Sequence, residues 1–177
     1  MKEILRYGII LALICMVASG LLAVVNSLTK DRIIALGKQE EELSLSEVLP
    51  RAIHFEPIKS DDNIIYYKGH DKENKFVGVA FKASGKGYSS TIETMVGMEK
   101  DGTIIAIKIL SQNETPGLGT NIVEPKFTGQ FADRNIQELA GAEAITGATI
   151  SSKAVIDTVK KKAEEIQKLI KNVPKDE

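Results

Sequence analysis

Residues 7–29 contain no charged side chain and are rich in leucine, isoleucine, alanine and valine. A helix of roughly 20 apolar residues spans the core of a bilayer, so this run is long enough to cross a membrane. A cleaved signal peptide is the alternative, but its apolar region is usually only about 7–15 residues long. The sequence therefore predicts a retained transmembrane anchor in residues 1–30, which contacts the lipid bilayer through residues 7–29.

A charged segment with helical character follows the anchor. Residues 31–50 are expected to form a helical stalk that ends at Pro50, and residues 51–177 are long enough for one further domain. Lysines and arginines lie on both sides of the apolar run. The positive-inside rule therefore does not decide on which side of the membrane the domain lies.

Several segments beyond the stalk have the composition of β-strands. Residues 63–68 and 75–81 are rich in β-branched and aromatic side chains, and a turn at residues 85–88 follows them. Residues 89–99 and 103–110 bracket Lys100-Asp101-Gly102, which is typical of a hairpin. Strands first and helices afterwards predict an α+β domain with an antiparallel sheet.

The C-terminal segment has the pattern of an amphipathic helix. Charged residues fill one face, while apolar residues recur on the other at spacings of three and four: Ile156, Val159, Ala163, Ile166 and Ile170. Ser151 or Ser152 is the expected N-cap, because a serine oxygen can accept a hydrogen bond from an unpaired N–H group. Asn172 and Pro174 are expected to end the helix.

The segment Thr146-Gly147-Ala148-Thr149-Ile150-Ser151-Ser152 leads into this helix. Backbone N–H groups and the macrodipole at a helix start favour a phosphate. Thr149 offers a hydroxyl nucleophile beside two residues too small to block a bulky reactant. The segment could therefore bind a phosphorylated cofactor or become esterified to one; a small-residue turn that only caps the helix is the alternative.

This segment resembles the flavinylation motif of the FMN-binding domain family, Asp-x-x-Ser/Thr-Gly-Ala-Thr/Ser. In that family the last hydroxyl residue carries FMN through a phosphoester bond, which a dedicated flavin transferase makes from FAD. The resemblance implies Thr149 as the attachment residue. The acidic position falls on Glu143, whose side chain is one methylene longer than the usual aspartate. The other implied cofactor-binding residues of this segment are Thr146, Gly147, Ala148 and Ser151.

A second motif, Glu114-Thr115-Pro116-Gly117-Leu118-Gly119, follows an apolar strand. Pro116-Gly117 is typical of a tight turn, and Gly119 allows close backbone approach. The hexapeptide is similar to the flavin-contacting loop of two families, the Rnf complex G subunits and the C subunits of the sodium-translocating NADH:quinone reductase. This resemblance implies Glu114, Thr115, Leu118 and Gly119 as cofactor-binding residues. A length of 177 residues favours the Rnf G subunits, because the other family is usually longer.

A few further residues are weaker candidates. In similar domains a glycine-tyrosine segment lies near the flavin, which implies Tyr88 and Ser89; a plain strand connector is the alternative. With no tryptophan in the chain, Phe127 is the other plausible aromatic partner of the flavin. Lys126 could pair with the phosphate, although a surface lysine is the commoner case.

The resemblance implies a function for the whole chain. It implies an electron-relay subunit of an Rnf-type, ion-translocating oxidoreductase that works between ferredoxin and NAD, with covalent FMN as the redox group. The other subunits and a flavin transferase are the implied partners. The FMN domain would lie on the extracytoplasmic (periplasmic) side of a bacterial or archaeal cytoplasmic membrane. A stand-alone extracytoplasmic flavoprotein shuttle and a sensory FMN-binding module are the alternatives.

Composition excludes several other roles. The net charge is −1 and no basic stripe is present, which argues against nucleic-acid binding. A single cysteine, Cys15, excludes an intrachain disulfide and a multi-thiol metal cluster, so no metal is expected. No Gly-x-Gly-x-x-Gly opens a helix after a strand, so NAD is not expected to bind. We therefore expect no catalytic residue and no complete active site in this chain alone.

Overall fold

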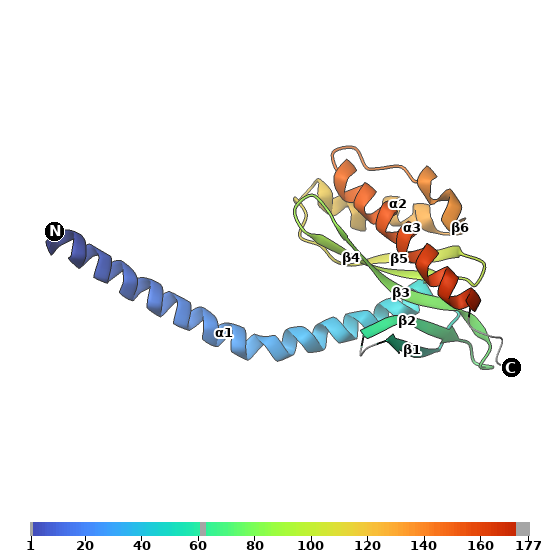
Figure 1. Ribbon diagram of the computed structural model, residues 1–177, viewed down its shortest axis with the longest axis horizontal. Helices are drawn as coiled ribbons and strands as arrows, with labels where there is room; N and C mark the ends of the chain where they lie inside the picture. The colour runs from blue at the N-terminus through green and yellow to red at the C-terminus, as the bar shows by residue number, and fades with distance from the viewer. Residues whose placement is uncertain (1, 61–62, 173–177) are drawn as a thin grey trace. The chain divides into compact units, whose positions relative to one another are not determined.

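The computed structural model describes residues 2–60 and 63–172 (Figure 1), so Pro174, expected to lie beyond the last helix, is outside the described residues. The chain divides into two compact units between Glu40 and Glu41. The first helix, α1, spans Lys2–Val48, so the division falls within it. The second unit therefore begins inside the segment that the sequence predicts to be a stalk.

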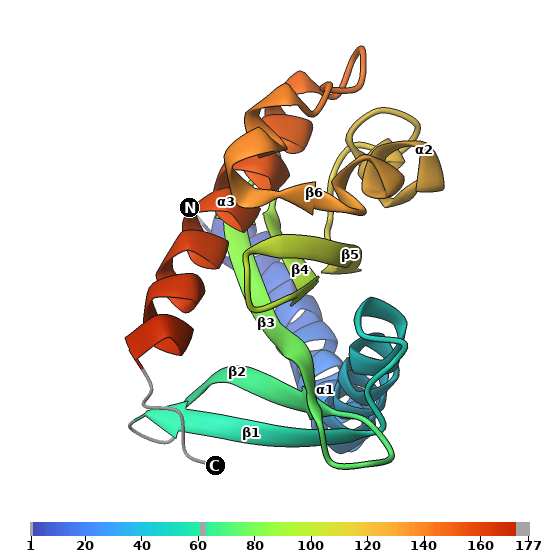
Figure 2. The same cartoon turned by 90° about the vertical axis from the view of Figure 1, so that its right-hand side faces the viewer.

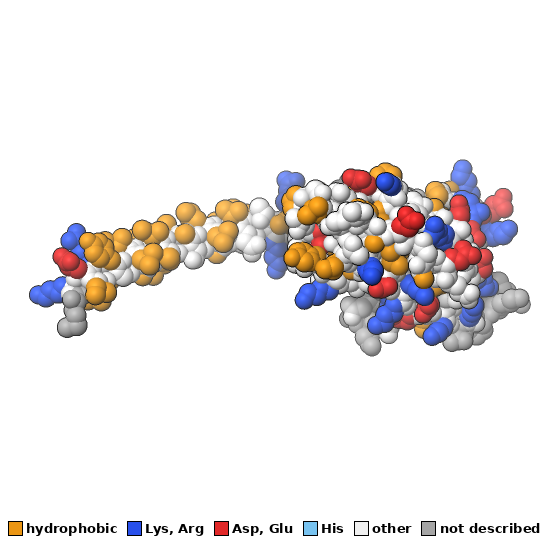
Figure 3. Space-filling view, turned by 90° about the horizontal axis from the view of Figure 1, so that it is seen from above, with side chains coloured by type: hydrophobic (Ala, Val, Ile, Leu, Met, Phe, Trp, Pro, Cys, Tyr) orange, Lys and Arg blue, Asp and Glu red, His pale blue; other side chains and the backbone are white. Residues whose placement is uncertain are grey.

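The first unit is the part of α1 up to Glu40. This helix is long and apolar enough to cross a membrane, and none of its most apolar window is buried. Figure 3 shows apolar side chains along the visible face of the helix and charged side chains at its N-terminal end. An apolar surface of this extent marks contact with a membrane or another protein. The helix is consistent with the single-pass anchor that the sequence predicts.

The second unit is built on one antiparallel sheet of six strands in the order β1-β2-β3-β4-β5-β6, which confirms the predicted α+β class. The sequence did not reveal β1, which carries Pro57 at the edge of the sheet, where a missing N–H is tolerated. It also did not reveal β6, which has two residues. The strands are β1 His54–Ser60, β2 Asn63–His70, β3 Phe76–Lys86, β4 Thr91–Met98, β5 Thr103–Ser111 and β6 Arg134–Asn135.

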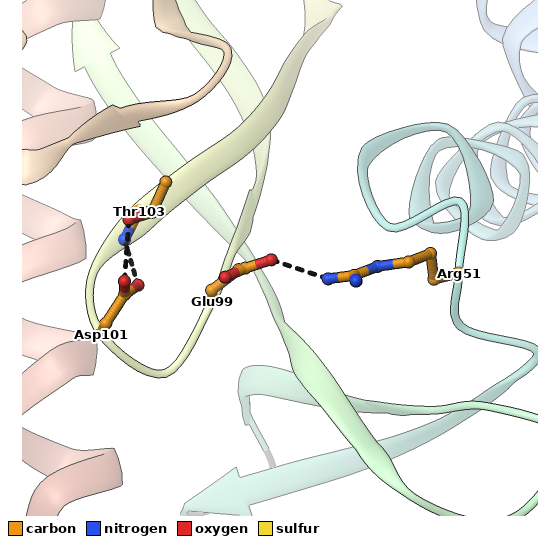
Figure 4. Close-up of polar contacts among 4 residues, drawn as sticks. All are labelled: Arg51, Glu99, Asp101 and Thr103. Atoms are coloured by element: carbon orange, nitrogen blue, oxygen red, sulfur yellow. Dashed lines mark hydrogen bonds and ion pairs between the residues drawn. The ribbon is translucent and has the colours of Figure 1, made fainter.

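The predicted hairpin between β4 and β5 is confirmed. Asp101 accepts hydrogen bonds from the backbone N–H of Thr103 at 2.9 Å and from its hydroxyl at 3.1 Å (Figure 4). Gly102 takes the positive φ of 97° that such a tight turn requires. Arg51, which follows α1, pairs with Glu99 at 2.7 Å; the arginine side chain is largely exposed and the glutamate side chain is partly buried.

The two faces of the sheet pack against different helices. Val79 and Phe81 of β3 point to the face covered by the C-terminal helix α3, Thr149–Asn172, which crosses the sheet (Figure 1). Ala80, between them, points to the opposite face and packs with Leu45 and Val48 of the last turns of α1. This alternation is the pattern expected of a strand buried on both sides.

The last turn of α1 lies unusually close to the sheet. A Cβ atom on Gly97 of β4 would collide with the carbonyl oxygen of Val48. Only glycine lets a helix backbone come this near a strand backbone. Residues 41–48 of α1 therefore pack as part of the globular unit.

Short helices connect β5 to α3 and close one end of the core. They are η1 Gly119–Val123, α2 Pro125–Thr128, η2 Gly129–Phe131 and η3 Ile136–Gly141. Two of these helices, η1 and η3, contact α3 (Figure 2). The order of elements thus brings the loop after β5 and the first turn of α3 together at one end of the sheet.

Candidate functional site

The helix α3 begins at Thr149, two residues before the first of the serines that the sequence predicts as its N-cap. The carbonyl oxygen of Ala148 accepts the hydrogen bond from the N–H of Ser152 at 2.9 Å. Ser152 Oγ reaches back and accepts a hydrogen bond from the N–H of Ile145 at 3.1 Å. The N-cap prediction is therefore wrong, because both serines lie inside the helix and their hydroxyls bond to other segments.

This start leaves Thr149 as the first residue of the helix, with its side chain exposed. The N–H groups in the first turn of a helix have no carbonyl partner within it, and they carry partial positive charge. An anion bound at Thr149 would meet these N–H groups directly. The residue thus combines an accessible hydroxyl with a local environment suited to a phosphate.

A cleft of about 480 Å³ opens beside Thr149. Its volume falls within the range of small-molecule sites, about 300–1,000 Å³. Three segments form its walls: the β3–β4 connection, the loop after β5, and the start of α3. The lining residues are Tyr88, Glu114, Thr115, Leu118, Gly119, Gly147, Ala148, Thr149, Ile150 and Ser151. A cofactor with an apolar ring and an anionic tail fits the size and the mixed chemistry of these walls.

Glu114 joins the three walls. Its carboxylate accepts hydrogen bonds from the N–H groups of Tyr88, Ser89 and Ser90 at 3.1, 3.0 and 2.9 Å. The Ser90 hydroxyl donates a further hydrogen bond at 3.3 Å, and the Ser151 hydroxyl donates one at 2.5 Å. Glu114 is only 4% exposed. Because five donors of the protein reach its carboxylate, the buried oxygens have hydrogen-bond partners.

These contacts decide the charge of Glu114. Burial alone raises the pKa of the carboxyl group, but hydrogen bonds from Ser151 and from the N–H groups of Ser90, Ser89 and Tyr88 lower it. The hydrogen bonds outweigh burial, and the pKa lies below its ordinary value. Glu114 is therefore ionised at neutral pH.

Two glycines make the walls meet. A Cβ on Gly119 would lie 2.7 Å from the Cβ of Glu114 and 3.0 Å from Ser151 Oγ. Gly147 has a φ of 82°, and a Cβ there would lie 3.2 Å from the Leu118 side chain. These residues bring the loop after β5 against the turn that precedes Thr149.

Three of the residues predicted from the sequence do not line the cleft. Lys126 lies on α2 with an exposed side chain, and Thr146 is exposed in the turn before α3. Ser89 contributes its backbone N–H to Glu114, while its side chain is exposed. The other predicted residues, from Tyr88 to Ser151, all belong to the lining.

Phe127 is wholly buried, at 0% exposure, and packs edge-to-face on Phe131 with ring centroids 5.5 Å apart. The prediction that Phe127 contacts a flavin is therefore wrong: its ring belongs to the core. Tyr88, in contrast, is 68% exposed at the cleft. Glu143 has an exposed side chain, and its backbone pairs with the side-chain amide of Gln130.

Sequence reasoning missed two residues of the site. Ile150 lines the cleft with 56% of its side chain exposed, and Ser90 holds the Glu114 carboxylate through both its N–H and its hydroxyl. Ile150 breaks the rule that a helix buries its aliphatic residues, which is the signal that could have found it. Nothing local distinguishes Ser90, because its partner is 24 residues away.

The chain matches two known protein families over separate parts of its length. The FMN-binding domain family matches residues 87–164, which contain the whole cleft. The RnfG N-terminal region matches residues 1–48, which include all of α1. The chain also resembles NqrC of Shewanella oneidensis in fold, with a TM-score of 0.51 and 20% identity over 69% of this chain and 74% of that one.

A second structure with a similar fold is the C subunit of the Na⁺-translocating NADH-quinone reductase from Parabacteroides distasonis, with a TM-score of 0.50 and 19% identity over 61% of this chain and 63% of that one. Two relatives found by sequence have a higher identity to this chain than these two structures. The G subunit of an ion-translocating oxidoreductase complex from Methanosarcina acetivorans is 34% identical over 89% of this chain and 92% of that protein. The G subunit of the Na⁺-translocating ferredoxin:NAD⁺ oxidoreductase complex from Acetobacterium woodii is 32% identical over 96% of this chain and 95% of that protein. The chain belongs to the G subunits of Rnf-type ion-translocating oxidoreductase complexes.

Proposed function

We propose that this chain carries FMN covalently on the hydroxyl of Thr149 and relays electrons within an Rnf-type complex that couples ferredoxin and NAD to ion translocation. The family membership and the FMN-binding domain support the electron-transfer role. The observation that carries the attachment site is the position of Thr149, which is exposed, lines the cleft and is the first residue of α3.

Attachment is a phosphoryl transfer from FAD by a flavin transferase. The Thr149 oxygen forms a bond to the FMN phosphorus, the pyrophosphate bond of FAD breaks, AMP leaves, and the hydroxyl proton is released. The small side chains of Gly147 and Ala148 leave room for the incoming phosphate. The unpaired N–H groups at the start of α3 stabilise the charge of the resulting phosphodiester.

The cleft walls then orient the cofactor. FMN, when bound, supplies the redox chemistry, and the protein supplies tether, orientation and electrostatics. Tyr88, Leu118 and Ile150 offer exposed apolar surface at the cleft for the flavin ring. Thr115 and Gly119 provide backbone and hydroxyl groups on the opposite wall. A covalent link prevents loss of FMN on the outer side of the membrane, where it would not be recovered.

The proposal includes the arrangement in the membrane. Residues 1–30 anchor the chain, residues 31–40 form a stalk, and the globular unit that begins at Glu41 holds FMN on the extracytoplasmic side. The other subunits of the complex exchange electrons with the flavin. Purification of the tagged chain from its native membrane tests this partnership: several polytopic membrane subunits should accompany it, and isolation of the chain alone would favour a stand-alone flavoprotein shuttle.

Flavin fluorescence in a denaturing gel tests the attachment. The full chain is co-expressed with a flavin transferase, boiled in detergent and run beside Thr149→Val, whose side chain has a similar volume. Thr128→Val, on α2 outside the cleft, is the matched control. The wild type and the control should fluoresce and Thr149→Val should be dark. A fluorescent Thr149→Val band would show that Thr149 is not the attachment residue.

A further inference from the structure

In the part of the chain that the structure describes, the Glu114 carboxylate is a buried charge without a cationic partner. Among residues 2–60 and 63–172, the ion pairs are Arg51–Glu99, Lys82–Glu41, Lys108–Glu47 and Lys162–Glu165, and none includes Glu114. Its donors are neutral N–H and O–H groups. Such donors hold the carboxylate in its ionised form, but they leave the net charge of −1 in place.

This charge has a fixed position in the wall of the cleft. Donors from the β3–β4 connection hold the carboxylate on one side and the Ser151 hydroxyl holds it on the other. Gly87 and Gly119 pack against it, and a Cβ on Gly87 would come within 2.6 Å of Glu114 Oε1. The carboxylate therefore cannot swing away from the cleft as a surface glutamate could.

A fixed negative charge opposes further negative charge nearby. Each electron added to a flavin brings one negative charge unless a proton is taken up with it, and the interaction between charges is stronger in a poorly solvated site than in water. The oxidised flavin ring is neutral, so the charge of Glu114 acts mainly on the reduced forms. The charge of Glu114 should therefore make reduction of a flavin in this cleft harder than it would be with an uncharged side chain at position 114.

We propose that Glu114 is the positioning residue of the cofactor cleft and that its charge lowers the midpoint potential of the bound FMN. This inference rests on the proposed function, because it requires FMN in the cleft. The electron added on reduction comes from a redox centre of a neighbouring subunit in the complex, or from dithionite in a titration. A low potential would suit a relay whose electrons come from strongly reducing donors.

The test compares the FMN midpoint potential of the full-length flavinylated chain, in detergent, with that of Glu114→Gln. Glutamine keeps the shape and most hydrogen bonds but removes the charge. The potential should rise, by about tenfold in the one-electron equilibrium constant, which equals about 59 mV. Glu124→Gln, which removes an exposed carboxylate outside the cleft, should leave the potential unchanged. An unchanged potential in Glu114→Gln would overturn the proposal.

Ser151→Ala separates charge from packing. This variant removes one donor to Glu114 but keeps the charge, which is then less well stabilised by hydrogen bonds, so the potential should fall. If loosening of the cleft were the cause, Ser151→Ala and Glu114→Gln would shift the potential in the same direction. A rise in Ser151→Ala as large as that in Glu114→Gln would therefore contradict an electrostatic role for Glu114.

A measurement on the wild type covers the case in which Glu114→Gln fails to fold. Infrared difference spectra between oxidised and reduced protein, with ¹³C-labelled glutamate, should contain a perturbed carboxylate band that shifts in Ser151→Ala. Absence of any such glutamate band would overturn the proposal. FMN held in the cleft without a bond to Thr149 would still permit every comparison, so the proposed attachment can fail separately. A chain that binds no FMN contradicts both proposals.

Discussion

Ser151 Oγ lies 2.5 Å from Glu114 Oε2, which joins residues 37 positions apart in the chain. Ser151 belongs to the first turn of α3, and Glu114 belongs to the loop after β5. Both side chains are buried, at 2% and 4% exposure. This hydrogen bond holds the helix that begins at Thr149 against the opposite wall of the cleft.

Loss of this bond should destabilise the globular unit. A hydrogen bond to a charged group contributes about 1.5–3 kcal/mol, so Ser151→Ala should lower the free energy of unfolding by about that amount. Thermal unfolding of the full chain in detergent measures the effect. Ser84→Ala, at an exposed position of β3, is the matched control and should change stability by less than about 0.5 kcal/mol. Equal effects in the two variants would contradict the role of Ser151.

The charge of Glu114 should make stability depend on pH. Its folded-state pKa lies below the ordinary value of 4.5, so it contributes stability above that pH, and this contribution is lost as pH falls through the folded pKa. The wild type should therefore be more stable than Glu114→Gln at neutral pH, and the difference should shrink below about pH 4.5. Unfolding curves of both proteins across this range measure it. A difference that does not change with pH would show that the carboxyl group has no lowered pKa.

The close contact between Gly97 and the last turn of α1 predicts a steric penalty. In Gly97→Ala the new methyl group meets the backbone oxygen of Val48, which cannot rotate away. Overpacking of this kind typically costs about 1–3 kcal/mol. Gly129→Ala is the control, because nothing lies within 4 Å of a Cβ there and its φ of −65° suits alanine. If Gly97→Ala unfolds at the same temperature as Gly129→Ala, Gly97 does not lie as close to the Val48 backbone as described.

Thr146→Val tests the segment that precedes the attachment residue. Thr146 is exposed and does not line the cleft, so its substitution should leave the fold intact. The resemblance to the flavinylation motif implies that it helps recognition by the transferase or holds the phosphate. The initial rate of covalent flavin loading should therefore fall while the unfolding temperature stays the same. An unchanged loading rate would reduce Thr146 to a turn residue.

The sequence named the residues that line the cleft better than it named the strands of the sheet. The two motifs around Thr149 and Glu114 are local strings, so their residues could be named, and most of them line one cleft. β1 was missed because Pro57 and its polar neighbours lack the pattern of a strand; its pairing with β2 supplies what local preference does not. Propensity is a weak guide wherever a neighbouring strand provides the hydrogen bonds.

The errors at Ser151, Ser152 and Phe127 share a physical cause. Each residue has a local preference that tertiary contacts override: the serines bond to Glu114 and Ile145 instead of capping the helix, and Phe127 packs on Phe131. No pattern within a few residues of either serine contains its partner. The hydrogen bond between Ser151 and Glu114, which are 37 positions apart, is a contact that only the structure reveals.

Mass spectrometry of the tryptic peptide that contains Thr149 tests the central claim most directly. Cleavage after Arg134 and Lys153 releases residues 135–153, which include every hydroxyl residue of the motif. In chain co-expressed with a flavin transferase, this peptide should gain the mass of FMN less one water, and fragmentation should locate the gain on Thr149. An unmodified peptide, or a flavin located on Thr146, Ser151 or Ser152, would contradict the account.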